Sequence, residues 1–145
     1  MYCISADKDD IAPLYIAAQN GHVDIVRILV VEGHAGVDQV RDDGATPLVV
    51  AAQNGHIDIV HFLLVEGHAA VDQADDEATT PLHMAAANGY VDIVRFLVIE
   101  RHAAVNQAYW HSTTPLSVAA QEDYIDTVCC LVAEGHAAVN QVKKG

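Results

Sequence analysis

Histidine recurs at one constant spacing along this chain, at positions 34, 68, 102 and 136. Each of these histidines lies in a variant of one hexapeptide, which reads EGHAGV, EGHAAV, ERHAAV and EGHAAV in turn. Imidazole binds zinc and titrates near neutral pH, so such a row could form a metal site or a proton-sensitive switch. The same pattern arises when one structural position is repeated. The choice depends on the elements that carry the histidines.

The prolines follow the same spacing as the histidines. Pro13, Pro47, Pro81 and Pro115 are each separated by 34 residues, and the segments around them match in register. Self-similarity with a period of about 20–50 residues is typical of stacked arrays. We therefore interpret the chain as a single domain, residues 1–145, built from four units at about residues 7–40, 41–74, 75–108 and 109–142.

The second unit shows the local structure expected of all four. Thr46 fits a helix N-cap, Pro47 the first helical position, and Gly55 the left-handed residue that ends a short helix. A second helix is predicted from about residue 57, with an apolar stripe and with Asp58 in its first turn. Polar, turn-rich connectors join the units. Isolated helices this short are marginal in water, so each unit must bury its apolar faces against its neighbours.

This architecture argues against a shared metal. Adjacent helical layers lie about 10 Å apart, whereas the ligands of one zinc ion each lie about 2 Å from it. Two imidazolium charges about 10 Å apart in water repel by only about 0.4 kcal/mol, so a proton switch would also be weak. We interpret the histidines as one repeated loop position, with metal binding and pH sensing as the less favoured alternatives.

A second recurrent ring position follows the first helix of each unit. It holds His22, His56, Tyr90 and Tyr124. A polar ring at this place is expected to satisfy backbone groups at a helix start.

The sequence contains no recognisable enzyme motif. There is no Gly-x-Ser-x-Gly, no phosphate-binding loop, and no cysteine with a suitably placed histidine and orienting group. We call positions 34 residues apart in successive units the same frame position. Cys129 falls at an exposed frame position and Cys130 at a core position, and neither fits a zinc-finger spacing. We therefore expect no catalytic residue, no metal site and no cofactor.

Charge narrows the class of partner. The formal net charge is −13, from 7 Lys and Arg against 20 Asp and Glu. So few basic residues disfavour binding to nucleic acid or to an anionic membrane, and no apolar run is long enough to span a bilayer. The negative electrostatic potential of such a chain favours a protein partner with a basic surface, although acidity can also serve solubility alone. The odd cysteine count and the lack of a signal peptide lead us to expect an intracellular, cytoplasmic location.

The units resemble ankyrin repeats. The resemblance rests on segments such as DDGATPLVVAAQNGHIDIV and TTPLHMAAANGYVDIVRFL, and it covers roughly residues 7–142. It implies an all-α fold, an α-solenoid of stacked helix–turn–helix layers with β-hairpin-like finger loops. It also implies a non-enzymatic module for protein–protein interaction.

The chain departs from the family pattern in the loop after the second helix. The period is 34 residues rather than the usual 33, and the extra residue lies beside the recurrent histidine. In the third unit Arg101 replaces the loop glycine. That turn must either hold a non-glycine residue at positive φ or adopt another geometry. In the first unit Ala12 replaces the N-cap threonine.

Binding residues are expected where the units differ, because stacking explains the shared positions. The fingers supply Asp42 and Asp43, Asp76 and Glu77, and the aromatic group Tyr109, Trp110 and His111. The family's contact positions on the first helices correspond to Gln53, Asn54, Asn88, Gln121 and Glu122, among others. We predict an acidic groove across the second and third fingers, closed by Trp110 as an exposed anchor. The alternative is that Tyr109 and Trp110 fold back onto a neighbouring layer.

Two other interpretations remain open at this point. The chain could be a structural spacer within a longer array, or a consensus-like engineered scaffold, without a dedicated partner. The ends could also self-associate, with Leu14, Tyr15 and Ile16 offered by the first unit.

Overall fold

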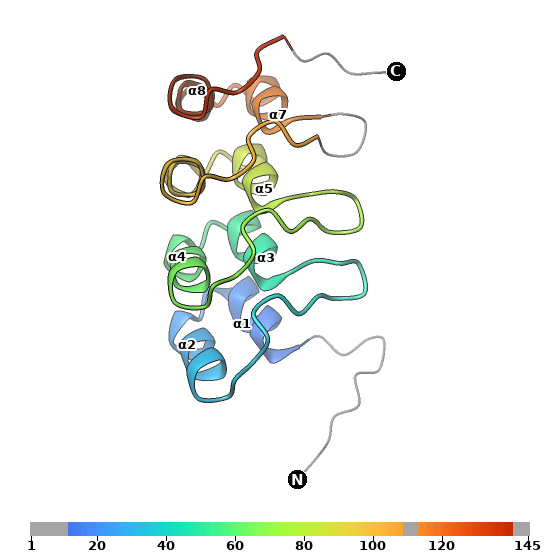
Figure 1. The fold of residues 1–145 in the computed structure, drawn as a ribbon, viewed down its shortest axis with the longest axis vertical. Coiled ribbons are helices and arrows are strands. Elements are labelled where there is room, and N and C mark those ends of the chain that lie inside the picture. Colours follow the sequence, from blue (N-terminus) through green and yellow to red (C-terminus); the bar gives the residue numbers. More distant parts are fainter. Residues whose placement is uncertain (1–11, 109–112, 141–145) are drawn as a thin grey trace.

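The computed structural model describes residues 12–108 and 113–140, and these form a stack of helix pairs (Figure 1). The first helices of the pairs are α1 (Pro13–Asn20), α3 (Pro47–Gln53), α5 (Pro81–Ala87) and α7 (Pro115–Gln121). The second helices are α2 (Val23–Val31), α4 (Ile57–Val65), α6 (Val91–Arg95) continued by η1 (Phe96–Glu100), and α8 (Ile125–Cys129) continued by η3 (Cys130–Glu134). The predicted all-α solenoid is confirmed.

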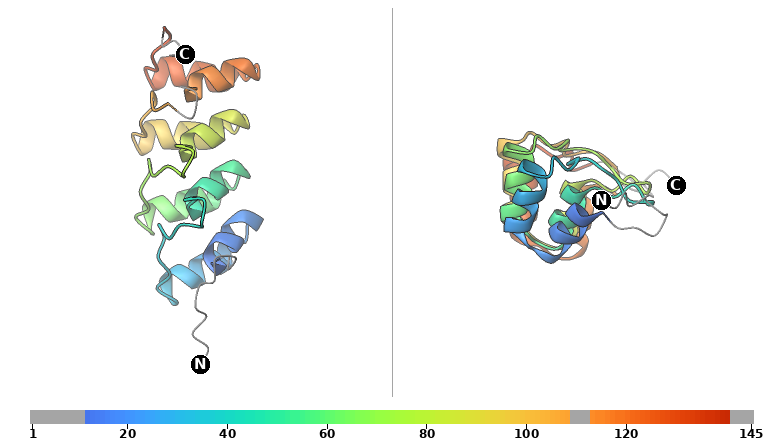
Figure 2. Two further views of the ribbon diagram at one scale, coloured as in Figure 1. Left: turned by 90° about the vertical axis from the view of Figure 1, so that its right-hand side faces the viewer. Right: turned by 90° about the horizontal axis from the view of Figure 1, so that it is seen from below.

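The helices form two columns. The first helices stack on one another beside the finger loops, and the second helices stack in a separate column away from the fingers (Figures 1 and 2). We call the surface made by the finger loops and α1, α3, α5 and α7 the finger-side face. Seen along the stack, the fingers project to one side of both columns (Figure 2, right).

Threonine caps begin three of the first helices, as predicted. Thr46 Oγ1 accepts the Val49 N–H at 3.1 Å, and Thr80 Oγ1 accepts the His83 N–H at 3.2 Å. At α7, Thr114 and Ser117 form a reciprocal capping box. Ala12, which precedes α1, has no such side-chain bond. The caps satisfy amide groups that a helix start would otherwise leave without partners.

The first helices end on a left-handed residue. Gly55 has φ +78°, and the neighbouring His56 N–H donates to the Ala51 carbonyl at 3.0 Å. In the fourth unit Asp123 takes this role at φ +61°. Because a Cβ disfavours this conformation, Asp123 holds a strained backbone that glycine would adopt freely.

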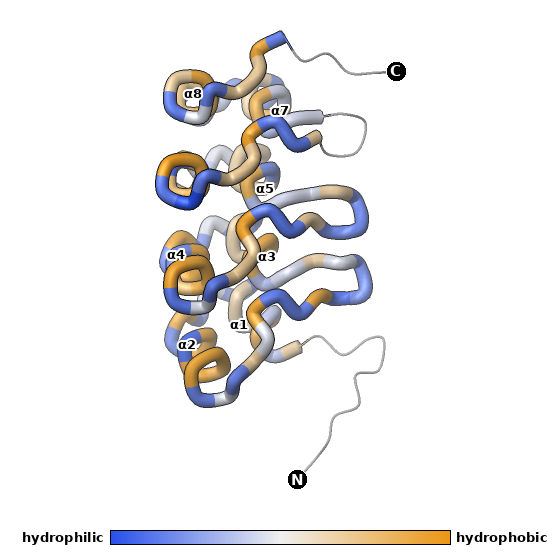
Figure 3. The backbone as a smooth tube through the Cα atoms, viewed as in Figure 1, coloured by the Kyte–Doolittle hydropathy of each residue, from blue (hydrophilic) through white to orange (hydrophobic). Residues whose placement is uncertain are grey.

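The core lies between the layers and between the two columns. Alanine pairs such as Ala51 and Ala52 are fully buried, which allows the first helices to approach closely. Leu48, Ile59 and Leu63 contribute large side chains at 0% exposure. Figure 3 shows the second helices rich in apolar residues and the finger tips hydrophilic. Burial between layers therefore stabilises helices that are individually too short to persist.

A ladder of side-chain hydrogen bonds joins successive loops. Asp38 accepts the Ala70 N–H at 3.0 Å, Asp72 accepts the Ala104 N–H at 3.0 Å, and Asn106 accepts the Ala138 N–H at 2.8 Å. The acceptors and donors belong to consecutive units. The recurrent Val-Asp/Asn-Gln motif thus orients each layer on the next.

Candidate protein-interaction surface

The recurrent histidines reverse the chain after each second helix. His34, His68, His102 and His136 all have φ between +52° and +55°, and all four are exposed. Histidine is one of the few non-glycine residues enriched in this region of backbone conformation. Among the described residues, no group of three or more His, Cys, Asp or Glu could hold a metal ion. The interpretation of a repeated loop position fits this geometry.

In the third and fourth units, the residue before the recurrent histidine lies in the helical region of backbone space. Arg101 has φ −109°, so this turn adopts another geometry and does not hold Arg101 at positive φ. The left-handed conformation falls on His102 instead. Arg101 N–H donates to the Phe96 carbonyl five residues earlier at 3.2 Å, and Gly67 bonds Phe62 in the same way at 3.0 Å. This wide turn accommodates the extra residue of the 34-residue period.

Arg101 also serves the preceding layer. Its Nη2 donates to the Leu64 carbonyl at 3.2 Å, near the C-terminal end of α4. A cation at this end of a helix interacts favourably with the helix dipole.

The second ring position contacts the preceding layer rather than its own helix. His56 Nε2 lies 3.0 Å from the Gln19 carbonyl oxygen, so the prediction of a contact at the helix start is wrong. The rings of His56, Tyr90 and Tyr124 lie over Gly21, Gly55 and Gly89, where a Cβ would come within 2.7–3.0 Å of the ring. Helix ends in one layer therefore support rings from the next.

The second and third fingers are ordered loops that bond each other. In the second finger, Asp43 Oδ1 accepts the Ala45 N–H at 3.1 Å. In the third, Asp75 Oδ1 accepts the N–H groups of Glu77 and Thr79, both at 2.9 Å. The Asp76 N–H donates to the Asp43 carbonyl at 2.9 Å and joins the two fingers. The predicted contact residues Asp42, Asp43, Asp76 and Glu77 are exposed on this joined pair.

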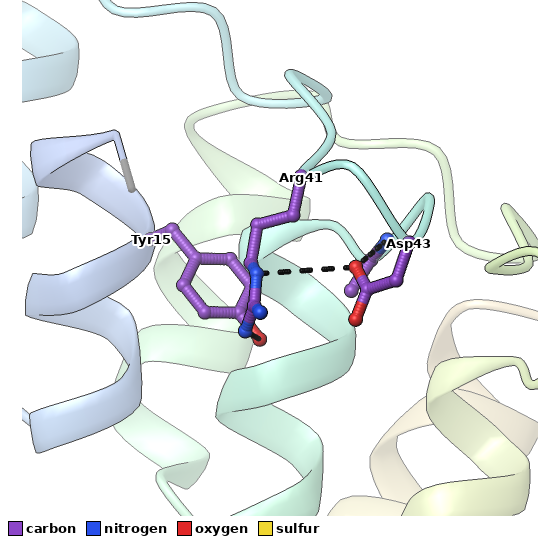
Figure 4. Close-up of polar contacts among 4 residues, drawn as sticks. Tyr15, Arg41 and Asp43 are labelled. Atoms are coloured by element: carbon purple, nitrogen blue, oxygen red, sulfur yellow. Dashed lines mark hydrogen bonds and ion pairs between the residues drawn. The ribbon is translucent and has the colours of Figure 1, made fainter. Parts of the chain in front are cut away.

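Arg41 lies at the base of the second finger, where its side chain contacts Tyr15 and Asp43 (Figure 4). Its guanidinium lies 4.9 Å from the centre of the Tyr15 ring, and its Nη1 donates to the Tyr15 hydroxyl at 3.2 Å. Its Nε is 3.9 Å from Asp43 Oδ1. The Tyr15 hydrogen bond is the main cause that raises the pKa of Arg41 above its usual value, and nearby Asp43 and Asp42 act in the same direction. This exposed ion pair contributes little to stability, and the charge of Arg41 offsets one negative charge of the second finger.

The remaining described candidates lie at the other ends of the first helices. Their side chains are exposed, and they are Gln53, Asn54, Asn88, Gln121 and Glu122. Asn54 Nδ2 donates to the Val50 carbonyl at 3.0 Å, and Asn88 Nδ2 donates to the Met84 carbonyl at 2.9 Å. The two asparagines therefore also stabilise helix ends. Tyr109, Trp110 and His111 lie outside the described residues.

A pocket lies between α5 and α7 on the finger-side face. Its volume is about 240 Å³, and it is lined by Thr79, His83, Met84, Ala87, Thr113 and Val118. Sequence reasoning did not find this pocket. The available signal was Ala87, which replaces the glutamine present at the same frame position in the other three units.

His83 forms part of the pocket wall and is 5% exposed. Burial lowers its pKa from 6.5 to about 4, against the opposing effect of hydrogen bonds with the backbone of Thr114 and Thr113 and of the charge on Asp75. The ring is therefore neutral at physiological pH and contributes little charge to the pocket.

The two adjacent cysteines differ as predicted. Cys129 is exposed and Cys130 is buried. Burial raises the pKa of the Cys130 thiol, so this group is an inert part of the core at neutral pH.

Comparison with known proteins agrees with the repeat architecture. A family model described as ankyrin repeats, in three copies, matches residues 2–75 and 63–143. No curated protein matches the sequence. Within the described residues, no helix is long and apolar enough to cross a membrane.

Proposed function

Because the chain belongs to the ankyrin-repeat family, whose repeats generally bind other proteins, we propose that it recognises a partner protein through its finger-side face. The partner presents a basic, partly apolar surface. Catalysis, nucleic-acid binding and membrane binding have no part in this proposal. The observation that carries it is the pair of joined fingers, on which Asp42, Asp43, Asp76 and Glu77 are exposed together.

The distribution of basic residues supports this choice of partner. Between residues 42 and 142 the only lysines or arginines are Arg95 and Arg101, and both belong to the second-helix side of the third unit. On the finger-side face of the second, third and fourth units, Arg41 at the base of the second finger is therefore the one lysine or arginine up to residue 142. An acidic field of this kind accelerates encounter with a basic surface and makes binding sensitive to salt.

A charge-neutralising variant tests the proposal. Changing Asp42, Asp43, Asp76 and Glu77 to their amides is expected to abolish the salt-sensitive part of partner capture in a pull-down. The matched control changes Glu32, Glu66, Glu100 and Glu134 to glutamine, because these four carboxylates lie at the C-terminal ends of the second helices and carry the same total charge. Equal loss in both variants, or no loss in either, would favour a spacer without a dedicated partner.

Trp110 is the proposed aromatic anchor beside the fingers, as the only tryptophan in the chain. Trp110→Ala is expected to weaken a captured partner by about 1–3 kcal/mol. Unchanged affinity would remove Trp110 from the contact surface.

Self-association through the ends is a second candidate, favoured by one comparison of exposure. Ile25 and Ile28 are 48% and 53% exposed, whereas Ile59 and Phe62 at the same frame positions in the second unit are 0% and 2% exposed. The first unit therefore presents, in the described part of the chain, apolar positions that are buried in the next layer. Leu14 and Tyr15 do not contribute as predicted, because both are buried, whereas Ile16 is 41% exposed.

A further inference from the structure

The pocket between α5 and α7 lies at a local departure from the repeat. Its floor and walls come from His83, Met84 and Ala87 on α5 and Val118 on α7, with Thr79 and Thr113 from the preceding loops. At the frame position of Ala87 the other units carry Gln19, Gln53 and Gln121. A glutamine is longer than an alanine by one methylene and an amide group, so Ala87 leaves more room beside the pocket than a glutamine would.

The size of the pocket selects the kind of group that fits. A cavity of about 150 Å³ holds a benzene ring, whereas pockets for drug-sized molecules begin at about 300 Å³. The 240 Å³ pocket lies between these limits and accommodates one large side chain. Met84, Ala87, Val118 and the two threonine methyl groups present mainly apolar atoms to that side chain.

The surroundings of the pocket select the charge of the flanking groups. Asp75 is close enough to act electrostatically on His83, and Asp76 and Glu77 are exposed on the same finger. Residues 102–142, which include all of α7 and the loop after it, contain no lysine or arginine. A segment that places an apolar side chain in the pocket therefore has its neighbouring residues beside carboxylates.

We infer that this pocket anchors one large apolar side chain of the partner protein, from a segment in which basic residues flank that side chain. The inference rests on the proposed function and names the specific contact that the finger-side face makes. The pocket provides selectivity by shape, and the third finger provides selectivity by charge.

The test uses defined peptides and a signal from the pocket itself. The chain contains two methionines, Met1 and Met84, so labelling the methionine methyl groups with ¹³C gives a pocket-specific NMR signal. The probes are capped pentapeptides with the sequences Lys-Lys-Leu-Lys-Lys, Lys-Lys-Ala-Lys-Lys and Glu-Glu-Leu-Glu-Glu. We expect the leucine peptide with lysines to shift the Met84 signal saturably, and the other two to bind roughly tenfold more weakly or less.

Ala87→Gln provides the matched variant. Glutamine stands at this position in three other units, so the helix tolerates it, and unchanged thermal unfolding confirms that the variant folds. The longer side chain is expected to obstruct the pocket that Ala87 lines and to weaken binding of the leucine peptide roughly tenfold. Gln19→Ala, the reverse change in the first unit, is the control that leaves binding at Met84 unaltered.

Several results would overturn the inference. These are absence of a saturable Met84 shift, equal binding by Ala87→Gln, equal binding of the glutamate peptide, or a Met84 shift that grows with protein concentration alone. The last result would assign the pocket to a second copy of the chain. If Met84 does not respond but partner capture still depends on the finger carboxylates, the inference fails while the proposed function stands. If neutralising those carboxylates does not change partner capture, the proposed function fails independently.

Discussion

At the scale of single residues, backbone conformation explains several recurrent side chains. The histidines at 34, 68, 102 and 136 are exposed and adopt positive φ, a structural role that one loop position has in all four units. Ala78 adopts a similar conformation, with φ +64°, at the place where the preceding finger has Gly44. Of these two fingers, only the third therefore has a strained residue at this position.

Ala78→Gly is expected to stabilise the protein by about 0.5–1 kcal/mol, because glycine relieves the left-handed strain at the expense of some chain entropy. Gly44→Ala is the opposing control. A Cβ there would lie 2.6 Å from Asp76 Oδ1 and 2.9 Å from the Asp76 nitrogen, so this change should destabilise. Urea unfolding of both variants measures the effect. Stability changes of the same sign in the two variants would contradict the backbone strain assigned to Ala78.

His83 predicts a pH dependence of stability. Its folded pKa is lowered to about 4 from 6.5, so the unfolded chain binds the proton first as pH falls. The contribution of the neutral buried ring is fully present above pH 6.5 and is lost as pH decreases towards 4, by up to about 3 kcal/mol.

His83→Val should remove this part of the pH dependence, and valine already occupies the same frame position at Val49. The measurement is the free energy of unfolding at intervals between pH 7 and pH 4. An identical slope in wild type and variant over that range would show that His83 does not titrate as described.

At the scale of elements, helix ends determine how the units connect. Three of the first helices begin at threonine caps, and all four end on a left-handed residue. Both features are visible in the sequence. The second helices end in a wider turn, with bonds such as Gly67 N–H to the Phe62 carbonyl. The position of the extra residue was visible in the sequence, but its accommodation in the helical turn depends on hydrogen bonds between non-adjacent residues.

Thr46→Ala is expected to cost about 1 kcal/mol, because the Val49 N–H loses its side-chain acceptor at a buried helix start. Ala12→Thr is the complementary change and should add a fraction of that amount if the cap geometry of α3 can form at α1. Chemical denaturation compares the two. No loss in Thr46→Ala would contradict a stabilising role for the cap.

At the scale of the whole molecule, the two ends of the stack differ. The first unit exposes Ile25 and Ile28 in the described structure, and the fourth exposes Ile125 at 66%. In the internal layers, the ring of one unit lies over a glycine of the preceding unit, but the fourth unit has Asp123 at that position. A further layer stacked there would meet a side chain, so the first-unit face is the better surface for association.

The corresponding prediction concerns oligomeric state. We expect the wild-type protein to associate as its concentration rises, and Ile25→Thr with Ile28→Ser to shift it towards monomer by reducing exposed apolar area. Ile125→Thr is the control at the opposite end and should have a smaller effect. Sedimentation velocity measures both, and a wild type that stays strictly monomeric at high concentration would exclude self-association.

The sequence by itself determined the repeat, the helix pairs, the threonine caps and the opposite burial of Cys129 and Cys130. Each of these follows from local propensity or from a position repeated in register, so the same residue pattern can be seen in several units of one chain. Only the tertiary structure decided that His56 contacts the Gln19 carbonyl, that the Asp76 N–H bonds the Asp43 carbonyl, and that Ala87 lines a pocket. These features join different layers, and their geometry depends on how the layers pack, which no single unit specifies.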